Sequence, residues 1–230
     1  MYGWSYVLVV FACIFTFWAQ LKVSRAYGRY SRVPNRRGIT GAQAAGMIMR
    51  ANGIDVPVEV IPGKLSDHFD PSANVLRLSS EVANGSTVAS VAIAAHEVGH
   101  ALQHAEDYTP IKIRGAIVPV VNISSKLAWP LIVLGIILSA AGRADGIGDT
   151  VLLIGIILFA AVVAFHMVTL PVELNASRRA LAQLEAADIV FEDETKGARR
   201  VLKAAAMTYL AALAVALAQL IRLLVIRGED

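Results

Sequence analysis

Residues 96–100, His-Glu-Val-Gly-His, form an HExxH sequence inside a stretch that favours a helix. Histidines four positions apart project from one helical face, roughly 6 Å apart along the axis, so both imidazoles can reach one zinc ion. Zinc lowers the pKa of its bound water to about 7, and the intervening carboxylate can take the proton of that water as it attacks a carbonyl carbon. The motif therefore predicts metal-assisted hydrolysis, with His96 and His100 as ligands and Glu97 as the base.

The residues before the motif indicate a buried helix. Ser86 is a candidate N-cap, and most residues from there to Ala95 are small or apolar. A helix on a solvated surface would be more polar. We therefore expect this helix to be buried, with its histidines facing a cleft.

A catalytic zinc site usually has three protein ligands, and one helix supplies only two here. His104 continues the series of histidines, but it lies roughly 12 Å of helical rise from His96, too far for both to bind one ion. The HExxHxxGxxH pattern is excluded, because Gln103 and Glu106 occupy the positions of its glycine and its third histidine.

Glu173 is the better candidate for the third ligand. A helix predicted to begin near Pro171 would carry Glu173 in its first turn. An acidic residue in that position could equally serve only to complement the positive end of the helix dipole. Position alone leaves these two interpretations open.

Three stretches together resemble a known family: HEVGHALQHAEDY at 96–108, LSDHFDP at 65–71 and LPVELNASRRAL at 170–181. They are similar to those of the bacterial membrane-bound neutral zinc metallopeptidases, the YugP-like proteins. The resemblance covers nearly the whole chain, including the placement of its apolar segments. It implies a gluzincin-type peptidase that binds Zn²⁺ and hydrolyses polypeptides.

The resemblance also assigns roles to individual residues. It implies that His96, His100 and Glu173 bind the zinc ion and that Glu97 is the catalytic base. Residues 173–177 are similar to the ExxAD element of the HtpX-like membrane peptidases, but Ser177 stands where an aspartate would orient a zinc-bound histidine. Ser177 and His104 are candidates for a supporting role beside the metal or at the oxyanion.

Composition predicts an integral membrane protein that is mostly helical. Apolar residues make up 56% of the chain and the mean hydropathy is +0.58, above the values of ordinary soluble domains. A membrane span needs about 20 helical residues, and four apolar runs approach this length. They cover residues 4–19, 127–142, 151–170 and 204–226.

The distribution of basic residues predicts the orientation. Residues 21–126 and 172–203 are rich in lysine and arginine, whereas the short segment 143–149 carries one basic residue. The positive-inside rule then places both halves of the proposed zinc site on the cytoplasmic side of a bacterial plasma membrane. The first span is expected to be an uncleaved anchor with its N-terminus outside.

These expectations divide the chain into five parts. They are a first transmembrane helix (1–24), a cytoplasmic α+β zincin-like module (25–126), transmembrane helices two and three with a short outside loop (127–171), cytoplasmic helices carrying the third ligand (172–203), and a fourth transmembrane helix with the C-terminus (204–230).

The net charge of the chain is +3, and attraction between its basic residues and anionic lipid headgroups explains this excess, so no nucleic-acid partner is expected. The single cysteine, Cys13, excludes an intramolecular disulfide.

Within the cytoplasmic module, Thr40 and Gln43 form a capping box that opens a helix ending near Gly53. Residues 56–61 and 74–78 have strand character. In gluzincins an edge strand before the HExxH helix pairs with the substrate backbone, and the resemblance assigns this role to residues 75–78. Pairing through the main chain would grip many sequences, so we expect broad specificity.

Two further alternatives concern the polar residues of this module. His68 could stabilise the oxyanion of the tetrahedral intermediate, but an Asx-type turn among Asp67, His68 and Asp70 is the preferred interpretation. A non-catalytic membrane scaffold with a structural zinc site would require four protein ligands, so His104 or Asp67 would have to join. A transporter is disfavoured, because the spans lack paired charges apart from His166 and Arg222, and no inverted repeat is visible.

Overall fold

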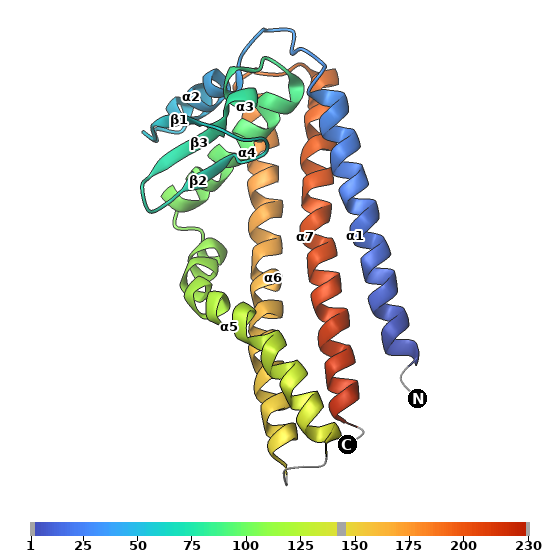
Figure 1. Ribbon diagram of the computed structural model, residues 1–230. Helices are drawn as coiled ribbons and strands as arrows, with labels where there is room; N and C mark the ends of the chain where they lie inside the picture. Colours follow the sequence, from blue (N-terminus) through green and yellow to red (C-terminus); the bar gives the residue numbers. More distant parts are fainter. Residues whose placement is uncertain (1–2, 142–145, 229–230) are drawn as a thin grey trace. The chain divides into compact units, whose positions relative to one another are not determined.

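A computed structural model of the protein describes residues 3–141 and 146–228. This part of the chain is mostly helical, as the sequence predicts, and contains one small sheet (Figure 1). The elements in chain order are α1 (Gly3–Tyr30), α2 (Gly41–Ala51), β1 (Val58–Ile61), β2 (His68–Asp70), β3 (Val75–Ser79), α3 (Ser80–Asn84), α4 (Val88–Ala105), α5 (Thr109–Ala140), α6 (Ile147–Ala186) and α7 (Glu192–Arg227).

The chain divides into two compact units. The first, here called the helical unit, comprises Met1–Trp18, Lys112–Leu170 and Tyr209–Asp230. The second, here called the sheet unit, comprises Ala19–Ile111 and Pro171–Thr208. The long helices α1, α6 and α7 each contribute residues to both units.

Within the described residues, four helices, α1, α5, α6 and α7, are long and apolar enough to cross a membrane, as the four apolar runs predict. The helices extend well beyond those runs. The 40 residues of α6 would span about 60 Å, roughly twice the hydrocarbon thickness of a bilayer. Helix α6 is therefore longer than a single span needs, and Glu173 follows its apolar run 151–170.

The helical unit has its own apolar core, formed mainly by α5 and α6. Gly135 and Gly155 allow these two helices to approach closely, because an added Cβ would lie 2.5 Å from the Leu152 nitrogen or 2.8 Å from Ile132. Small residues at helix contacts are typical of membrane bundles. At one end of this unit, Arg227 of α7 pairs with Asp149 of α6 at 3.0 Å.

The expected helix start near Pro171 is wrong, because α6 continues through this proline without interruption. Proline removes one backbone donor, but flanking turns can hold a helix together when they are well packed. Here the turns after Pro171 are anchored by fully buried residues at four-residue spacing, Val172, Ala176, Ala180 and Leu184. Glu173 therefore lies inside a helix, so the interpretation that it only complements a helix start does not apply.

The sheet has the order β1-β3-β2, with β1 parallel and β2 antiparallel to β3 (Figure 1). The predicted strands at 56–61 and 74–78 are present as β1 and β3. The expectation that residues 75–78 form an edge strand is wrong, because β3 is paired on both sides. Strand β2, three residues in a polar stretch, was not predicted from the sequence, and it occupies the edge that β3 would otherwise have formed.

Helices α2 and α4 pack with the sheet around the core of this unit. The capping box of α2 is confirmed, since the Thr40 and Gln43 side chains each accept a hydrogen bond from the backbone of the other residue. The N-cap of α4 is Thr87, not Ser86, and its hydroxyl accepts from the Ser90 amide at 3.1 Å. Fully buried residues of the core include Ile48, Leu76, Leu78, Val91 and Val98.

Part of the basic segment expected to face lipid headgroups makes contacts within the sheet unit. Arg36 pairs with Asp193 at 2.6 Å, and its backbone amide donates to Glu194 at 2.7 Å. The guanidinium groups of Arg36 and Arg37 also lie over the ring of Phe191. These contacts attach the segment between α1 and α2 to the start of α7.

Candidate metal centre

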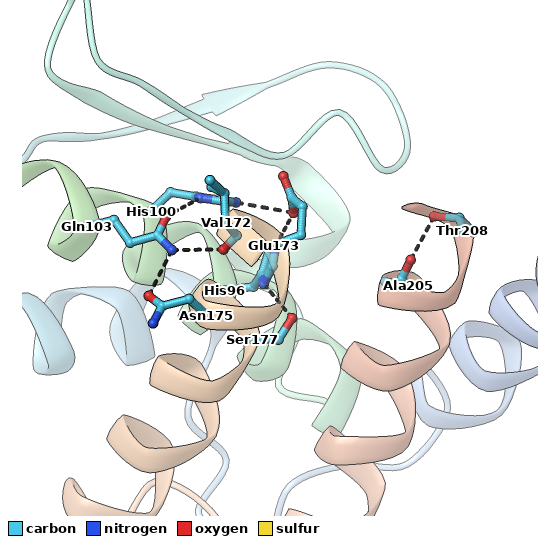
Figure 2. A network of polar contacts seen from close by, with 9 residues as sticks. All are labelled: His96, His100, Gln103, Val172, Glu173, Asn175, Ser177, Ala205 and Thr208. Carbon is cyan, nitrogen blue, oxygen red and sulfur yellow. Dashed lines mark hydrogen bonds and ion pairs between the residues drawn. The ribbon is translucent and has the colours of Figure 1, made fainter. Parts of the chain in front are cut away.

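Helices α4 and α6 bring the three expected ligands together (Figure 2). Nε2 of His96 lies 3.3 Å from Oε2 of Glu173, and Nε2 of His100 lies 3.5 Å from the same oxygen. The ligand atoms of the three residues all lie within 4.8 Å of one another. Among residues 3–141 and 146–228, this is the one group of three His, Cys, Asp or Glu side chains placed to hold a metal ion.

The chemistry of this group fits zinc. Two imidazole nitrogens and one carboxylate oxygen are the protein ligands of a catalytic zinc site that keeps a position for water. Glu173 is 2% exposed, and a buried carboxylate needs a compensating positive charge. His96 and His100 could hold a zinc ion together with Glu173, and the ion would supply that charge.

The electrostatics of His100 reflect the same arrangement. Burial lowers the pKa of His100, but its hydrogen bond to Glu173 and the charges of Glu97 and Glu173 outweigh this effect, so the pKa is raised. The carboxylates thus make the environment of His100 favourable to positive charge. A divalent cation would take the place of the proton in this environment.

Glu97, the expected catalytic base, is 9% exposed and precedes the second ligand by one helical turn. Burial raises the pKa of Glu97, the charges of His96 and His100 lower it, and the net change is upward. A carboxylate with a raised pKa is a better proton acceptor near neutral pH. The position and environment of Glu97 therefore suit proton transfer at this centre.

Each histidine has a partner at its second ring nitrogen. Oγ of Ser177 lies 3.3 Å from Nδ1 of His96, which places this candidate residue against the ligand it was expected to support. Nδ1 of His100 lies 3.0 Å from Oε1 of Gln103. Gln103 was not predicted to have a role. From the sequence, it served only to exclude the HExxHxxGxxH pattern, because it occupies the position of the glycine. Its spacing of three from His100 on one helix was the signal that could have identified it.

The other candidate residues lie outside the ligand group. His68 is exposed on β2, with Nδ1 2.8 Å from the Ser66 carbonyl oxygen. The ring of His104 packs edge-on against Phe69 at 5.8 Å. Neither histidine is among the side chains that converge with Glu173.

The acidic residues of the LSDHFDP stretch have structural contacts. Oδ1 of Asp67 accepts hydrogen bonds from the backbone amide of Ser79 at 2.7 Å and from its hydroxyl at 3.0 Å. Asp70 accepts from the amides of Ser72 and Ala73, which is the Asx-type turn that the sequence favours. Neither carboxylate is grouped with the three converging ligands, so the scaffold alternative lacks its fourth ligand among the described residues.

Membrane-length helices combined with a buried centre of two histidines and one glutamate are typical of membrane zinc metallopeptidases. The chain belongs to the family described as "Putative neutral zinc metallopeptidase", which it matches over residues 5–228. It is 44% identical over 226 residues to a Bacillus subtilis (strain 168) protein named "Putative membrane protease YugP", with 97% of each chain covered. No solved structure matches the chain.

Proposed function

We propose that this protein is a membrane-embedded, zinc-dependent endopeptidase of the gluzincin type. The observation that carries the proposal is the convergence of His96, His100 and Glu173 from two helices, with Glu97 beside them in the HExxH motif. Three protein ligands leave a coordination position for water, as a catalytic zinc site requires. A structural zinc site would use four.

In the proposed reaction, His96, His100 and Glu173 hold the zinc ion. When bound, zinc lowers the pKa of a coordinated water and polarises the scissile carbonyl group. Glu97 accepts the proton of the attacking water and returns it to the nitrogen of the leaving amine. One carboxylate thus acts first as base and then as acid, so Glu97 is unchanged after each turnover.

Strand β2 is the proposed docking edge for the substrate. It is an edge strand of the described sheet, and its Phe69 side chain contacts His104 near the end of α4. A substrate that adds a strand to β2 would be held by main-chain hydrogen bonds beside the helix that carries the HExxH motif. This corrected assignment replaces residues 75–78, whose hydrogen-bonding groups are already engaged by β1 and β2.

Membrane proteins and their juxtamembrane tails are the proposed substrates, cleaved at the cytoplasmic face. Glu173 follows the apolar run 151–170 by only three residues, and both ligand-bearing segments are basic. A substrate would have to be unfolded enough to pair as a strand. Purified protein that cut soluble casein as readily as membrane-inserted substrates would contradict this preference.

The proposed catalysis is tested by replacing Glu97 with glutamine in the detergent-purified protein. Glu97→Gln should retain zinc at wild-type affinity and lose peptide cleavage by about two to four orders of magnitude, the usual contribution of a proton-transfer group. Zinc content and cleavage of a quenched fluorescent peptide are measured on the same preparation. Loss of zinc in this variant would assign Glu97 a structural role and overturn the proposal.

A further inference from the structure

Gln103 is fully buried beside the proposed metal centre and lies one turn beyond His100 on the same face of α4 (Figure 2). Its side-chain amide makes three contacts. Oε1 lies 3.0 Å from Nδ1 of His100, while Nε2 donates to the Val172 carbonyl oxygen at 2.8 Å and to Oδ1 of Asn175 at 2.9 Å. Both N–H groups and the oxygen of the amide are thereby used.

The partners fix which way round this amide lies. A backbone carbonyl can only accept a hydrogen bond, so the atom of Gln103 that faces Val172 must be the NH₂ nitrogen. The orientation of Asn175 agrees, because its Oδ1 also accepts from Nε of Arg179 at 2.7 Å, and a guanidinium can only donate. Oε1 of Gln103 is therefore the atom that faces His100.

This orientation determines the tautomer of His100. Oε1 can only accept, so Nδ1 of His100 must carry the proton, and in the neutral ring the lone pair is then on Nε2. Nε2 is the nitrogen that faces Oε2 of Glu173. The hydroxyl of Ser177 can donate or accept, so it does not by itself impose a tautomer on His96.

We propose that Gln103 is a positioning residue that holds His100 as its Nδ1–H tautomer, with Nε2 directed at the zinc ion. The inference rests on the proposed zinc-peptidase function. The acceptor Oε1 carries this role. The bond from Nε2 to the Val172 carbonyl oxygen shows which way round the amide lies.

The test compares zinc affinity in three variants, measured by competition with a chromophoric chelator on detergent-purified full-length protein. Gln103→Met keeps the side-chain size but removes the acceptor, and it should weaken zinc binding by about 10- to 100-fold. Gln103→Glu keeps an acceptor for His100 and should bind zinc within a few-fold of wild type, although it loses both donor contacts. The visible spectrum of the Co²⁺-loaded protein should change in the methionine variant and not in the glutamate variant.

Asn175→Ala is the matched control within the same network. It removes one acceptor of Gln103 and a contact of Arg179, but it leaves the Val172 carbonyl to orient the amide. Its melting temperature should fall while its zinc affinity stays within a few-fold of wild type. This separates loss of folding stability from loss of ligand orientation.

Wild-type affinity in Gln103→Met would overturn the inference. An equal loss of affinity in folded Gln103→Met and Gln103→Glu would also overturn it, because the acceptor would then be irrelevant. If the methionine variant does not fold, a folded glutamate variant that has lost zinc affinity about 10-fold or more overturns the inference equally. Failure of the wild-type protein to bind zinc would instead overturn the proposed function, and that result needs no variant.

Discussion

Gly99 of α4 lies directly against the backbone of Ala176 of α6. A Cβ atom at Gly99 would lie 2.7 Å from the Ala176 carbonyl oxygen and 3.2 Å from its carbonyl carbon and Cα. The two helices can therefore approach this closely only because position 99 lacks a side chain. This contact lies between His96 and His100 on one helix and beside Glu173 on the other, so it sets the separation of the ligands.

Replacing Gly99 with alanine should damage the metal centre through this contact. The atoms that the new methyl group would meet are all backbone, so α6 itself must move, at a cost of about 1–3 kcal/mol in the free energy of unfolding. Zinc affinity should fall with it. Gly28→Ala is the control, because a Cβ there meets nothing within 4 Å, and it should leave both quantities unchanged or slightly improved. Equal effects of the two variants would contradict this explanation.

Removing the carboxylate of Glu173 should weaken zinc binding more than removing any outer partner. Glu173→Ala loses one of three direct ligands, whereas loss of an outer partner typically costs about 10- to 100-fold in affinity. Glu185→Ala is the control on the same helix, because Glu185 is exposed and forms only a long ion pair with Arg199, at 3.9 Å. Metal titration distinguishes the two variants. Full zinc affinity in Glu173→Ala would exclude Glu173 as the third ligand.

Replacing Asp67 with alanine separates the catalytic site from the structural-zinc alternative. Asp67 accepts hydrogen bonds from the Ser79 amide and hydroxyl, so its loss should reduce the free energy of unfolding by about 1–3 kcal/mol. Zinc affinity should stay near wild type, because Asp67 is not grouped with the converging ligands. The same retention is expected for His104→Ala. A large loss of zinc in either variant would favour a site with four protein ligands.

The proposed orientation can be tested by cysteine labelling in intact cells. Cys13→Ser removes the native thiol, and Arg178→Cys or Ile147→Cys then introduces one exposed thiol. A membrane-impermeant maleimide should label Ile147→Cys in intact cells and Arg178→Cys only after permeabilisation, because the basic segment is expected inside. Labelling of Arg178→Cys from outside would place the metal centre on the opposite face.

Local sequence patterns predicted much of the fold. The four long apolar helices, the capping box at Thr40 and the strands β1 and β3 each follow from composition or periodicity within one segment. The ligand set was accessible for a similar reason. HExxH places two ligands by helical geometry alone, and the family resemblance supplied Glu173.

Two predictions were wrong because contacts with distant parts of the chain outweighed the local sequence pattern. Pro171 is a typical helix start, yet buried contacts of the following turns carry α6 straight through it. Residues 75–78 have an ordinary strand pattern, and only the pairing of the short strand β2 makes β3 central. Strand order depends on partners distant in sequence, so no window within the strand encodes it.

The sequence by itself determined that the chain has membrane-length helices and that one helix presents two imidazoles on one face, because both are properties of residue type and helical repeat. Only the tertiary structure decided that Glu173 meets these imidazoles, that Gln103 faces His100, and that Gly99 admits the second helix. These contacts join residues about 70 to 80 positions apart on α4 and α6, or depend on side-chain orientation. They are set by how two buried helices pack, which no local pattern specifies.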